Sequence, residues 1–499
     1  MPPSPQLRRR RLGTMDIVFF SVAAVAPLAV TGGVVTATYA VTGVTGVPLS
    51  FIILAAALSL FAVGYAAMSR YVANAGAFYS YLANGLGATP AVGGAFVALV
   101  SYNALQIGIY GLYGSAFADF ISSTTGLSLP WWVWAAVALL FVGLLGVRRV
   151  DLNARVLAVL LVLECIVVVL YDIGAFGHPA TSELTFGAAF LPSSLFVPGV
   201  AAVFAFGVTA FIGFEAGAIY SEECRNPRVT VARATFIAVG FVGLFYAISS
   251  WAMLVTVGPA NIQQAATANV GVVLDGLAAH WGATVSTIAG LLFLTSNFAA
   301  LLSFHNGVAR YLFALGRERV LPVALSRVGA RSGGPVAGSL AQTALAVVVL
   351  SIFVLSGTEP VLEMFTWLSG ISAVGVVLLM AGTSAAVVGF FRGRSSAASM
   401  WQRAVAPTLA TIALVALVVL IIGNFDALLG TDPTSPLRWI LPGLVLLAAV
   451  AGAIWATRLK ATRPDVYAAI GTTGGAMDDD ESVVLNLPPT GGPRHELRP

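Results

Sequence analysis

The chain has 499 residues, of which 58% are hydrophobic and only 9% are charged. A soluble domain has about 25% charged residues, so this composition excludes an ordinary water-soluble globular protein and indicates one that lies mostly in lipid. The formal net charge of +4 is small, and we attribute it to the sidedness of a membrane protein rather than to nucleic-acid binding.

Apolar segments long enough to cross a bilayer recur along almost the whole chain. A membrane-spanning helix needs about 20 mostly apolar residues, and twelve segments meet this condition, at 16–42, 47–69, 91–120, 131–147, 154–175, 196–220, 231–257, 284–310, 335–356, 361–391, 404–424 and 437–457. These segments should be helices, because no water satisfies backbone groups in the hydrocarbon core. The alternating pattern of a membrane β-barrel is absent from the sequence. The sequence therefore predicts an all-α integral membrane protein with twelve transmembrane helices.

Basic residues are distributed very unevenly between the two sides of these spans. If the amino terminus is cytoplasmic, only Arg438 of the 25 lysine and arginine residues falls outside. Basic residues are enriched on the cytoplasmic side of membrane proteins, so the pattern predicts a multi-pass protein of the cell (plasma) membrane with both termini in the cytoplasm. Residues 1–15 then form a cytoplasmic tail, and residues 458–499, rich in glycine, proline and acidic residues, form a disordered cytoplasmic tail.

Two of the predicted spans contain residues that weaken a helix. The first span has Pro27, which lacks a backbone donor, followed by the flexible sequence Thr-Gly-Gly at 31–33. The sixth span, at 196–220, has several glycines around the acidic residue Glu215. A glycine in a membrane helix often serves only close packing, but interruptions at corresponding positions of two halves indicate a transporter built from inverted repeats. Broken helices offer free backbone donors and acceptors, and an amino-acid zwitterion needs both.

Several motifs resemble those of the amino acid–polyamine–organocation (APC) family of permeases. GFE at 213–215 and EECRNPRVTVARAT at 222–235 resemble the family's sixth span and the loop after it. FHNGVARYLFALGRERVLP at 304–322 resembles the end of the eighth span and the following loop, and TGG at 31–33 occupies the place of the family's Gly-Ser-Gly motif. The resemblance extends from the first to the tenth span.

The resemblance implies the LeuT-type fold, in which two five-helix units form an inverted repeat. Residues 16–391 would form this ten-helix transport core, with the first repeat at 16–175 and the second at 196–391, and residues 403–457 would add two peripheral helices. It also implies substrate binding by the two broken spans, a role that falls to Ala26, Pro27, Thr31, Gly32, Gly33, Thr209, Ala210, Phe211 and Gly213. Glu215 matches the acidic residue of the family's sixth span.

Further polar residues inside the spans each have two interpretations. An isolated charge at Glu164, deep in the fifth span, is costly in a bilayer, so we expect this carboxyl group to be protonated or paired. With Glu215 it is our candidate for proton coupling, and a structural hydrogen bond is the alternative. Asn103 and Gln106 share one face of the third span, where they either line the substrate pocket or form a hydrogen-bonded seam between helices.

The eighth span carries two hydroxyl residues, Thr295 and Ser296, near its middle. In sodium-coupled proteins of the LeuT-type fold, hydroxyl groups of this span hold the ion, so the resemblance makes these residues a candidate cation site. Alternatively, they cap carbonyl groups of their own helix. We expect H⁺ rather than Na⁺ as the coupling ion, and no cofactor or metal, because the sequence shows no cluster of metal-ligating residues.

These features predict a secondary active transporter (permease) that moves an amino acid, neutral rather than cationic, by alternating access. The alternatives are an importer or exchanger of polyamines or cationic amino acids, and a nutrient receptor that binds without transport. An enzyme is not expected, because the HExxH pair of zinc proteases and a serine elbow are absent. The expected partners are the small-molecule substrate and the lipid bilayer, without nucleic acid, and the sequence leaves the oligomeric state open.

Overall fold

The computed structural model describes residues 13–72, 78–148, 154–181, 185–215, 227–329, 333–392, 394, 398–430 and 434–471. Within these ranges all regular structure is helical and no strand occurs. The predicted all-α fold class is therefore confirmed.

In the described part of the chain, eleven helices are long and apolar enough to cross a membrane, and they coincide with eleven of the predicted spans. Most consist of one helix: α4 (Val47–Met68), α6 (Ala88–Thr125), α7 (Trp131–Arg148), α8 (Ala154–Gly177), α13 (Pro227–Val257), α16 (Ala283–Arg317), α17 (Val336–Leu355) and α21 (Leu437–Thr462). Two others begin with a π-helical turn: η4 (Pro360–Phe365) continues into α18 (Thr366–Phe391), and η5 (Trp401–Val405) into α19 (Ala406–Gly423). The first span is divided into α1 (Thr14–Val25), α2 (Pro27–Ala29), the π-helix η1 (Val30–Val35) and α3 (Thr36–Thr42).

The sixth predicted span, 196–220, differs from the others. Its described residues contain the shorter apolar helix α11 (Val200–Phe211), followed by a turn that reaches Glu215. Residues 216–220 lie outside the described part of the chain. A multi-pass membrane protein is confirmed, and the number twelve stays a prediction.

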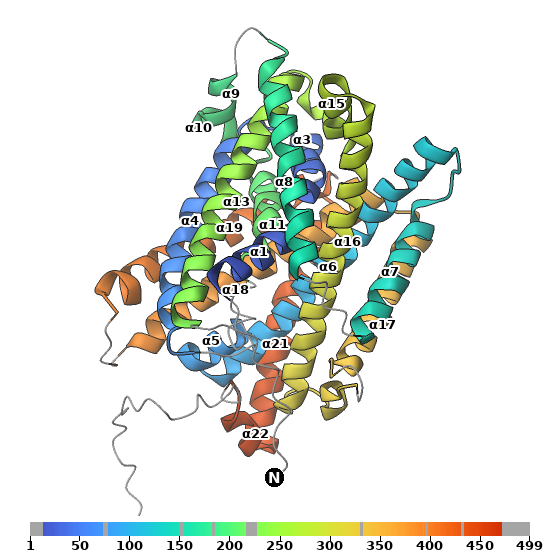
Figure 1. Ribbon diagram of the computed structural model, residues 1–499. Coiled ribbons are helices and arrows are strands. Elements are labelled where there is room, and N and C mark those ends of the chain that lie inside the picture. Colours follow the sequence, from blue (N-terminus) through green and yellow to red (C-terminus); the bar gives the residue numbers. More distant parts are fainter. Residues whose placement is uncertain are drawn as a thin grey trace, which may run out of the picture.

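The long helices lie side by side, the short helices α1 and α11 lie in the middle of the bundle, and several other short helices lie at its two ends (Figure 1). One end carries α9 (Phe186–Phe190), α10 (Pro192–Leu195) and α15 (Gly271–Trp281), and the other carries α5 (Phe78–Leu86) and α22 (Pro464–Ala468). The remaining short elements are α14 (Ile262–Ala266), the 3₁₀-helix η3 (Val323–Ser326) and α20 (Asp426–Leu429). We refer below to the α15 end and the α5 end.

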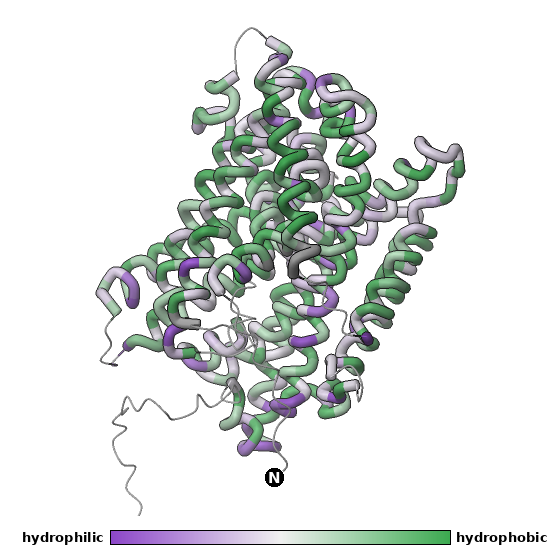
Figure 2. The backbone as a smooth tube through the Cα atoms, viewed as in Figure 1, coloured by the Kyte–Doolittle hydropathy of each residue, from purple (hydrophilic) through white to green (hydrophobic). Residues whose placement is uncertain are grey.

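Large apolar side chains cover the outside of the bundle as well as its core. Hydrophobic residues follow the long helices, while hydrophilic residues gather toward the ends (Figure 2). Leu140, Val348 and Val419 are each more than half exposed, which would favour aggregation in water but is expected for side chains that contact lipid.

Helix α6 lies among several other long helices, α7, α16, α18 and α21, and packs against its neighbours through small residues. A Cβ atom added at Gly111 would come within 2.5 Å of the Pro360 carbonyl oxygen, and one added at Gly452 would come within 2.6 Å of the Val92 carbonyl oxygen. Such close backbone approach is typical of membrane helices that associate through small residues. The site described below is built around this helix.

The predicted disordered tail, 458–499, is wrong over its first part. Helix α21 continues to Thr462 and α22 follows, with Val466 and Ile470 only 4% and 5% exposed. The apolar spacing of these two residues, four apart, fits one helical face, and their burial is what orders a segment of otherwise polar composition. Residues 472–499 lie outside the described part of the chain.

The ordered part of the tail is held at the α5 end by specific polar contacts. The Tyr79 phenol donates to Glu318 Oε2 at 2.5 Å, and the Gly471 amide donates to the same oxygen at 3.1 Å. Burial and the neighbouring Glu318 carboxylate raise the pKa of the Tyr79 phenol, so this group remains a donor at physiological pH.

Candidate functional site

The first span is interrupted at Ala26 rather than at its Thr-Gly-Gly sequence. Helix α1 ends at Val25, and Ala26 has φ 54° and ψ 77°, the left-handed conformation that a residue with a Cβ rarely adopts. Pro27 then begins α2, because it has no amide proton with which to continue α1. Both residues are buried, so the break lies inside the protein, and π-helical turns such as η1 directly after it often mark functional sites.

Of the two places at which the first span is predicted to weaken, Pro27 lies at the break, whereas Thr31, Gly32 and Gly33 do not. These residues lie within η1 and are buried, and the Thr31 hydroxyl donates to the Pro27 carbonyl at 2.9 Å. An added Cβ at Gly32 would come within 2.9 Å of Val270, and one at Gly33 within 2.7 Å of Leu112. Both glycines therefore allow close packing of neighbouring side chains. From the sequence alone, a glycine that allows close packing cannot be distinguished from one at which a helix is interrupted.

The sixth span is interrupted at its predicted position. Helix α11 ends at Phe211, and Gly213 has φ 120°, a conformation that glycine adopts far more easily than other residues. Glu215 folds back onto this turn: its Oε2 accepts from the Gly213 amide at 2.9 Å, and its Oε1 accepts from the Tyr102 phenol at 2.7 Å. The carboxyl group is only 2% exposed, so these two donors are what makes its burial tolerable.

Glu164 lies at the break in the first span. Its Oε2 accepts from the Ser296 hydroxyl at 2.7 Å and from the Leu28 amide at 3.5 Å, so one carboxyl group connects α8 with α16 and α2. Thr295 is exposed and donates to the Leu292 carbonyl of its own helix at 3.0 Å. Of the two hydroxyl residues of the candidate cation site, Ser296 therefore lies at the break in the first span, next to Glu164, and Thr295 does not.

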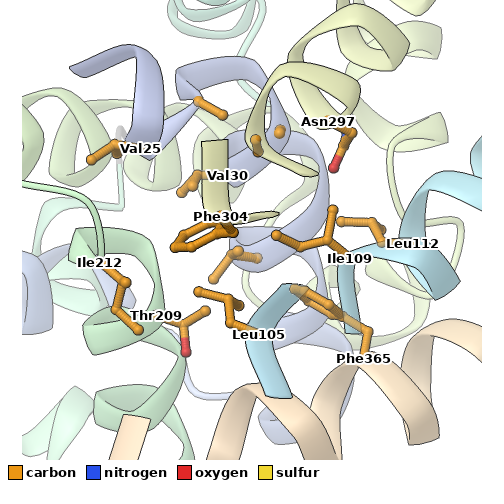
Figure 3. A pocket seen from close by; sticks show the side chains of 14 residues that line it. Val25, Val30, Leu105, Ile109, Leu112, Thr209, Ile212, Asn297, Phe304 and Phe365 are labelled. Carbon is orange, nitrogen blue, oxygen red and sulfur yellow. The ribbon is translucent and has the colours of Figure 1, made fainter. Parts of the chain in front are cut away.

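A small cavity lies between the two breaks (Figure 3). Its lining comes from the first span, from one face of α6, from the end of α11, and from α16 and η4: Val25, Ala26, Ala29, Val30, Val34, Leu105, Ile109, Leu112, Thr209, Ile212, Asn297, Ala300, Phe304 and Phe365. Among the described residues, Thr209 and Asn297 are the polar side chains in this lining, and no charged side chain takes part in it. The cavity is therefore suited to an apolar group.

Only some of the residues predicted to bind substrate line this cavity. Ala26 and Thr209 do, whereas Pro27, Ala210, Phe211 and Gly213 lie next to lining residues in the chain. The Asn103 side chain donates to the Leu99 carbonyl of its own helix at 2.6 Å and is absent from the lining.

Gln106 belongs to a buried polar seam between α6, α16 and α17. Its side-chain nitrogen lies 3.5 Å from His305 Nδ1, and His305 Nε2 lies 2.7 Å from the Ser339 hydroxyl. The Gln342 side-chain nitrogen donates to the side-chain oxygen of Gln106. Of the two interpretations of Gln106, these contacts support the interhelical seam rather than the pocket wall.

The sequence interpretation missed Tyr102 and the apolar wall of α6. Tyr102, Leu105, Ile109 and Leu112 are spaced by three and four residues, so they share one helical face. Tyr102 lies where this face meets Glu215, with its ring centroid 6.3 Å from that of Phe304 in the cavity lining. The three- and four-residue spacing of this apolar face is visible in the sequence. The polar residues Asn103 and Gln106 lie on the adjacent face, and the sequence-based prediction rested on them.

Comparison with known proteins agrees with this architecture. Residues 12–448 match the family model described as amino acid permease. The chain is 25% identical over 341 residues to the branched-chain amino acid permease BcaP of Bacillus subtilis, covering 64% of this chain and 70% of that protein. It is 26% identical over 324 residues to the uncharacterized transporter Rv1999c of Mycobacterium tuberculosis (61% and 68% covered) and over 306 residues to the L-asparagine permease of Escherichia coli (56% of each). The chain therefore belongs to the amino acid permease family, within the APC permeases that its first, sixth and eighth spans resemble.

Proposed function

We propose that this protein is a secondary active transporter that moves a neutral amino acid across the cell membrane by alternating access. One observation carries the proposal: two interrupted spans meet at one cavity, and its lining, as far as the described chain forms it, contains no charged side chain. Interrupted helices leave backbone donors and acceptors without helical partners, and these groups suit the carboxylate and the ammonium of an amino acid. A LeuT-type inverted repeat would account for the pairing of the first span with the sixth.

The lining of the cavity favours an aliphatic side chain on the substrate. Leu105, Ile109 and Leu112 of α6 line it together with Val30 and Val34 of η1. Burial of each methylene group in such a site contributes about 0.8 kcal/mol. The B. subtilis relative is named a branched-chain amino acid permease, which agrees with this substrate class. A polyamine or a cationic amino acid would need a buried carboxylate in the lining, and Glu164 and Glu215 lie outside it.

Proton coupling is the second part of the proposal. Glu164 holds the backbone of α2 and the Ser296 hydroxyl at the break in the first span. A buried carboxylate is costly in a membrane unless it is paired or protonated, so gain and loss of a proton at Glu164 would change how firmly α8 holds α2. This gives a physical link between a proton and the movement of the first span, with Glu215 as a second candidate group at the other break.

The proposed topology places the α5 end of the bundle in the cytoplasm. Arg70 follows α4, Arg317 ends α16 and Arg392 follows α18. The ends of α16 and α18 meet α5, where Glu318 accepts from Tyr79 and Gly389 approaches Gly85. Both termini would then be cytoplasmic. Labelling of single cysteines from either side of intact cells tests this orientation.

Transport by purified protein in proteoliposomes tests the function directly. We expect labelled leucine, isoleucine or valine to exchange with the unlabelled compound, and an inward proton gradient to drive accumulation when choline replaces sodium. Arginine and putrescine should not compete. Competition by either one would overturn the substrate class, strict sodium dependence would overturn proton coupling, and binding without exchange would identify a receptor.

A further inference from the structure

One side chain in the cavity lining has a hydrogen-bond acceptor that the described protein leaves unused. Asn297 of α16 lines the cavity and is only 1% exposed. Its side-chain nitrogen donates to the Phe293 carbonyl of the same helix at 2.9 Å. Because that carbonyl can only accept, the amide nitrogen faces it and the amide oxygen faces away from it. This Oδ1 atom accepts no hydrogen bond from the described residues, and it points from α16 toward Ile109 (Figure 3).

The other polar side chain of the lining is bonded within the protein. The Thr209 hydroxyl donates to the Ala205 carbonyl of its own helix at 3.0 Å and lies 3.4 Å from the Ser369 carbonyl of α18. The hydroxyl group is therefore engaged by the backbone of α11 and α18. Of the lining side chains that described residues contribute, Asn297 is the one whose acceptor is available to a molecule in the cavity.

A buried amide oxygen in an otherwise apolar cavity requires a donor from a ligand. Buried polar groups are nearly always hydrogen-bonded, and each exception needs an explanation. The Oδ1 atom of Asn103 on α6 is also buried without a partner among the described residues, but Asn103 is absent from the cavity lining. The position in the lining therefore distinguishes Asn297, because a ligand in the cavity can reach its oxygen.

A neutral aliphatic amino acid carries all its strong hydrogen-bond donors on one group. Its carboxylate only accepts, its side chain has no polar atom, and its ammonium group has three donors. Hydrogen bonds in which the donor is charged are also stronger than those between neutral groups. For the substrate proposed above, the ammonium is therefore the group that can donate to Asn297 Oδ1.

The helix that carries Asn297 also packs at the break in the first span. Its neighbour Ser296 donates to Glu164, and the same Glu164 oxygen accepts from the Leu28 amide of α2. Helix α16 packs against α2, and Val25, the last residue of α1, lines the same cavity as Asn297. The carboxyl end of a helix carries a partial negative charge that favours a cation. The end of α1 and the Asn297 oxygen thus both favour a cationic group in this cavity.

We propose that Asn297 binds the α-ammonium group of the substrate through its side-chain oxygen and so selects amino acids over analogues that lack the amino group. The amide supplies an acceptor without a charge. An amine that has no carboxylate would therefore leave its positive charge uncompensated in the cavity, which is costly. This inference rests on the proposed function, because it takes a neutral aliphatic amino acid as the substrate.

The test measures how two analogues of leucine inhibit leucine counterflow in proteoliposomes. 4-Methylpentanoate lacks the amino group of leucine, and 3-methylbutylamine lacks the carboxylate. Asn297→Leu keeps the approximate size of the side chain and removes the acceptor. We expect the affinity for leucine to fall about tenfold or more, because a hydrogen bond to a charged group is lost, while the affinity for 4-methylpentanoate is unchanged.

Asn103→Leu is the matched control. It removes a buried amide that makes the same kind of bond to its own helix but lies outside the cavity lining, so the ratio of the two affinities should stay as in the wild type. A wild-type ratio in Asn297→Leu, whether from equal losses for both compounds or from no loss, would overturn the inference.

Asn297→Asp tests the same contact by a gain of binding. It keeps an oxygen atom at this place and adds a negative charge, so 3-methylbutylamine should bind about tenfold or more tightly than it does to the wild type. If Asn297→Leu fails to fold, an affinity for this amine that is unchanged in Asn297→Asp would count against the inference instead.

Valine and threonine distinguish recognition of the ammonium from recognition of the substrate's side chain. The two amino acids have nearly the same shape, but the threonine side chain has a hydroxyl donor. If Asn297→Leu changes the preference between them and leaves the ratio of leucine to 4-methylpentanoate unchanged, Asn297 binds a side-chain hydroxyl. The inference is then wrong, and transport of a neutral amino acid stands. Failure of the proposed function would appear in the wild type itself, as an absence of leucine exchange.

Discussion

The two interrupted spans are stabilised in different ways. In the sixth span the break is stabilised by neighbours in the chain. Gly213 adopts a positive φ, and its amide donates a hydrogen bond to the carboxyl group of Glu215, two residues later. In the first span the break is held from a distance, because Glu164 lies 136 residues from Leu28, whose amide it accepts. A carboxyl group that joins separate helices responds to their relative movement, whereas one within a turn mainly maintains that turn.

This difference assigns separate roles to the two glutamates. Glu164 connects α8, α2 and α16 through a single oxygen, so a proton there weakens contacts between helices. Glu215 shares its oxygens between its own turn and Tyr102 of α6. We therefore expect Glu164 to dominate proton coupling and Glu215 to dominate the shape of the substrate site.

Closing the break in the sixth span should reduce transport more than any other change considered below. Gly213→Ala places a Cβ on a residue with φ 120°, and backbone strain of this kind costs about 1–3 kcal/mol. Relief of the strain would displace Ile212, which lines the cavity. We expect uptake and exchange to fall roughly ten- to hundredfold, since about 1.4 kcal/mol corresponds to a factor of ten.

Gly240→Ala on α13 is the matched control for this change. An added Cβ at Gly240 meets nothing within 4 Å, so this variant should transport like the wild type. Wild-type exchange by Gly213→Ala, measured with equal amounts of reconstituted protein, would show that the sixth span does not need its open turn.

The next largest loss of transport should come from a change at Glu164, which stabilises the break in the first span from another helix. Glu164→Gln keeps a hydrogen-bond acceptor for Ser296 or Leu28 but cannot bind a proton. We expect accumulation under a proton gradient to fall about tenfold or more, while counterflow exchange of the same substrate remains. Equal losses of accumulation and exchange would mean that Glu164 only supports the structure. The assignment of proton coupling to Glu164 rather than to Glu215 would then be wrong.

Tyr102→Phe tests the non-local contact of Glu215. It leaves one oxygen of a buried carboxyl group without a donor, which costs about 1–3 kcal/mol, and the effect should appear as a lower midpoint of thermal unfolding. Exchange should fall about fivefold, less than for Gly213→Ala, because the bond from the Gly213 amide is retained. Tyr113→Phe, on the same helix, is the control. Equal unfolding midpoints for the two variants would contradict a stabilising role of the Tyr102 hydroxyl.

The same contrast explains which features were predictable from the sequence. The eleven confirmed spans and the break at Gly213 depend on composition and on neighbours in the chain, so they could be predicted. In the first span Pro27 marked the break, but the sequence could not show that Gly32 and Gly33 pack closely within η1 or that the partner of the Leu28 amide lies in another helix. Burial of Ile470 likewise depends on distant packing, and for this reason the ordered part of the tail was predicted to be disordered.

The smallest effect distinguishes two neighbouring hydroxyl groups of α16. Ser296 donates to Glu164, whereas Thr295 is exposed and donates to its own helix. Ser296→Ala removes a donor to the carboxylate and so makes proton binding easier. We therefore expect the pH at which uptake is half-maximal to rise by up to about one unit, the equivalent of 1.36 kcal/mol. Thr295→Ala should leave the midpoint of the pH profile unchanged. A profile that shifts for Thr295→Ala but not for Ser296→Ala would mean that the outward-facing hydroxyl serves the coupling site, and the long-range connection through Glu164 would then be wrong.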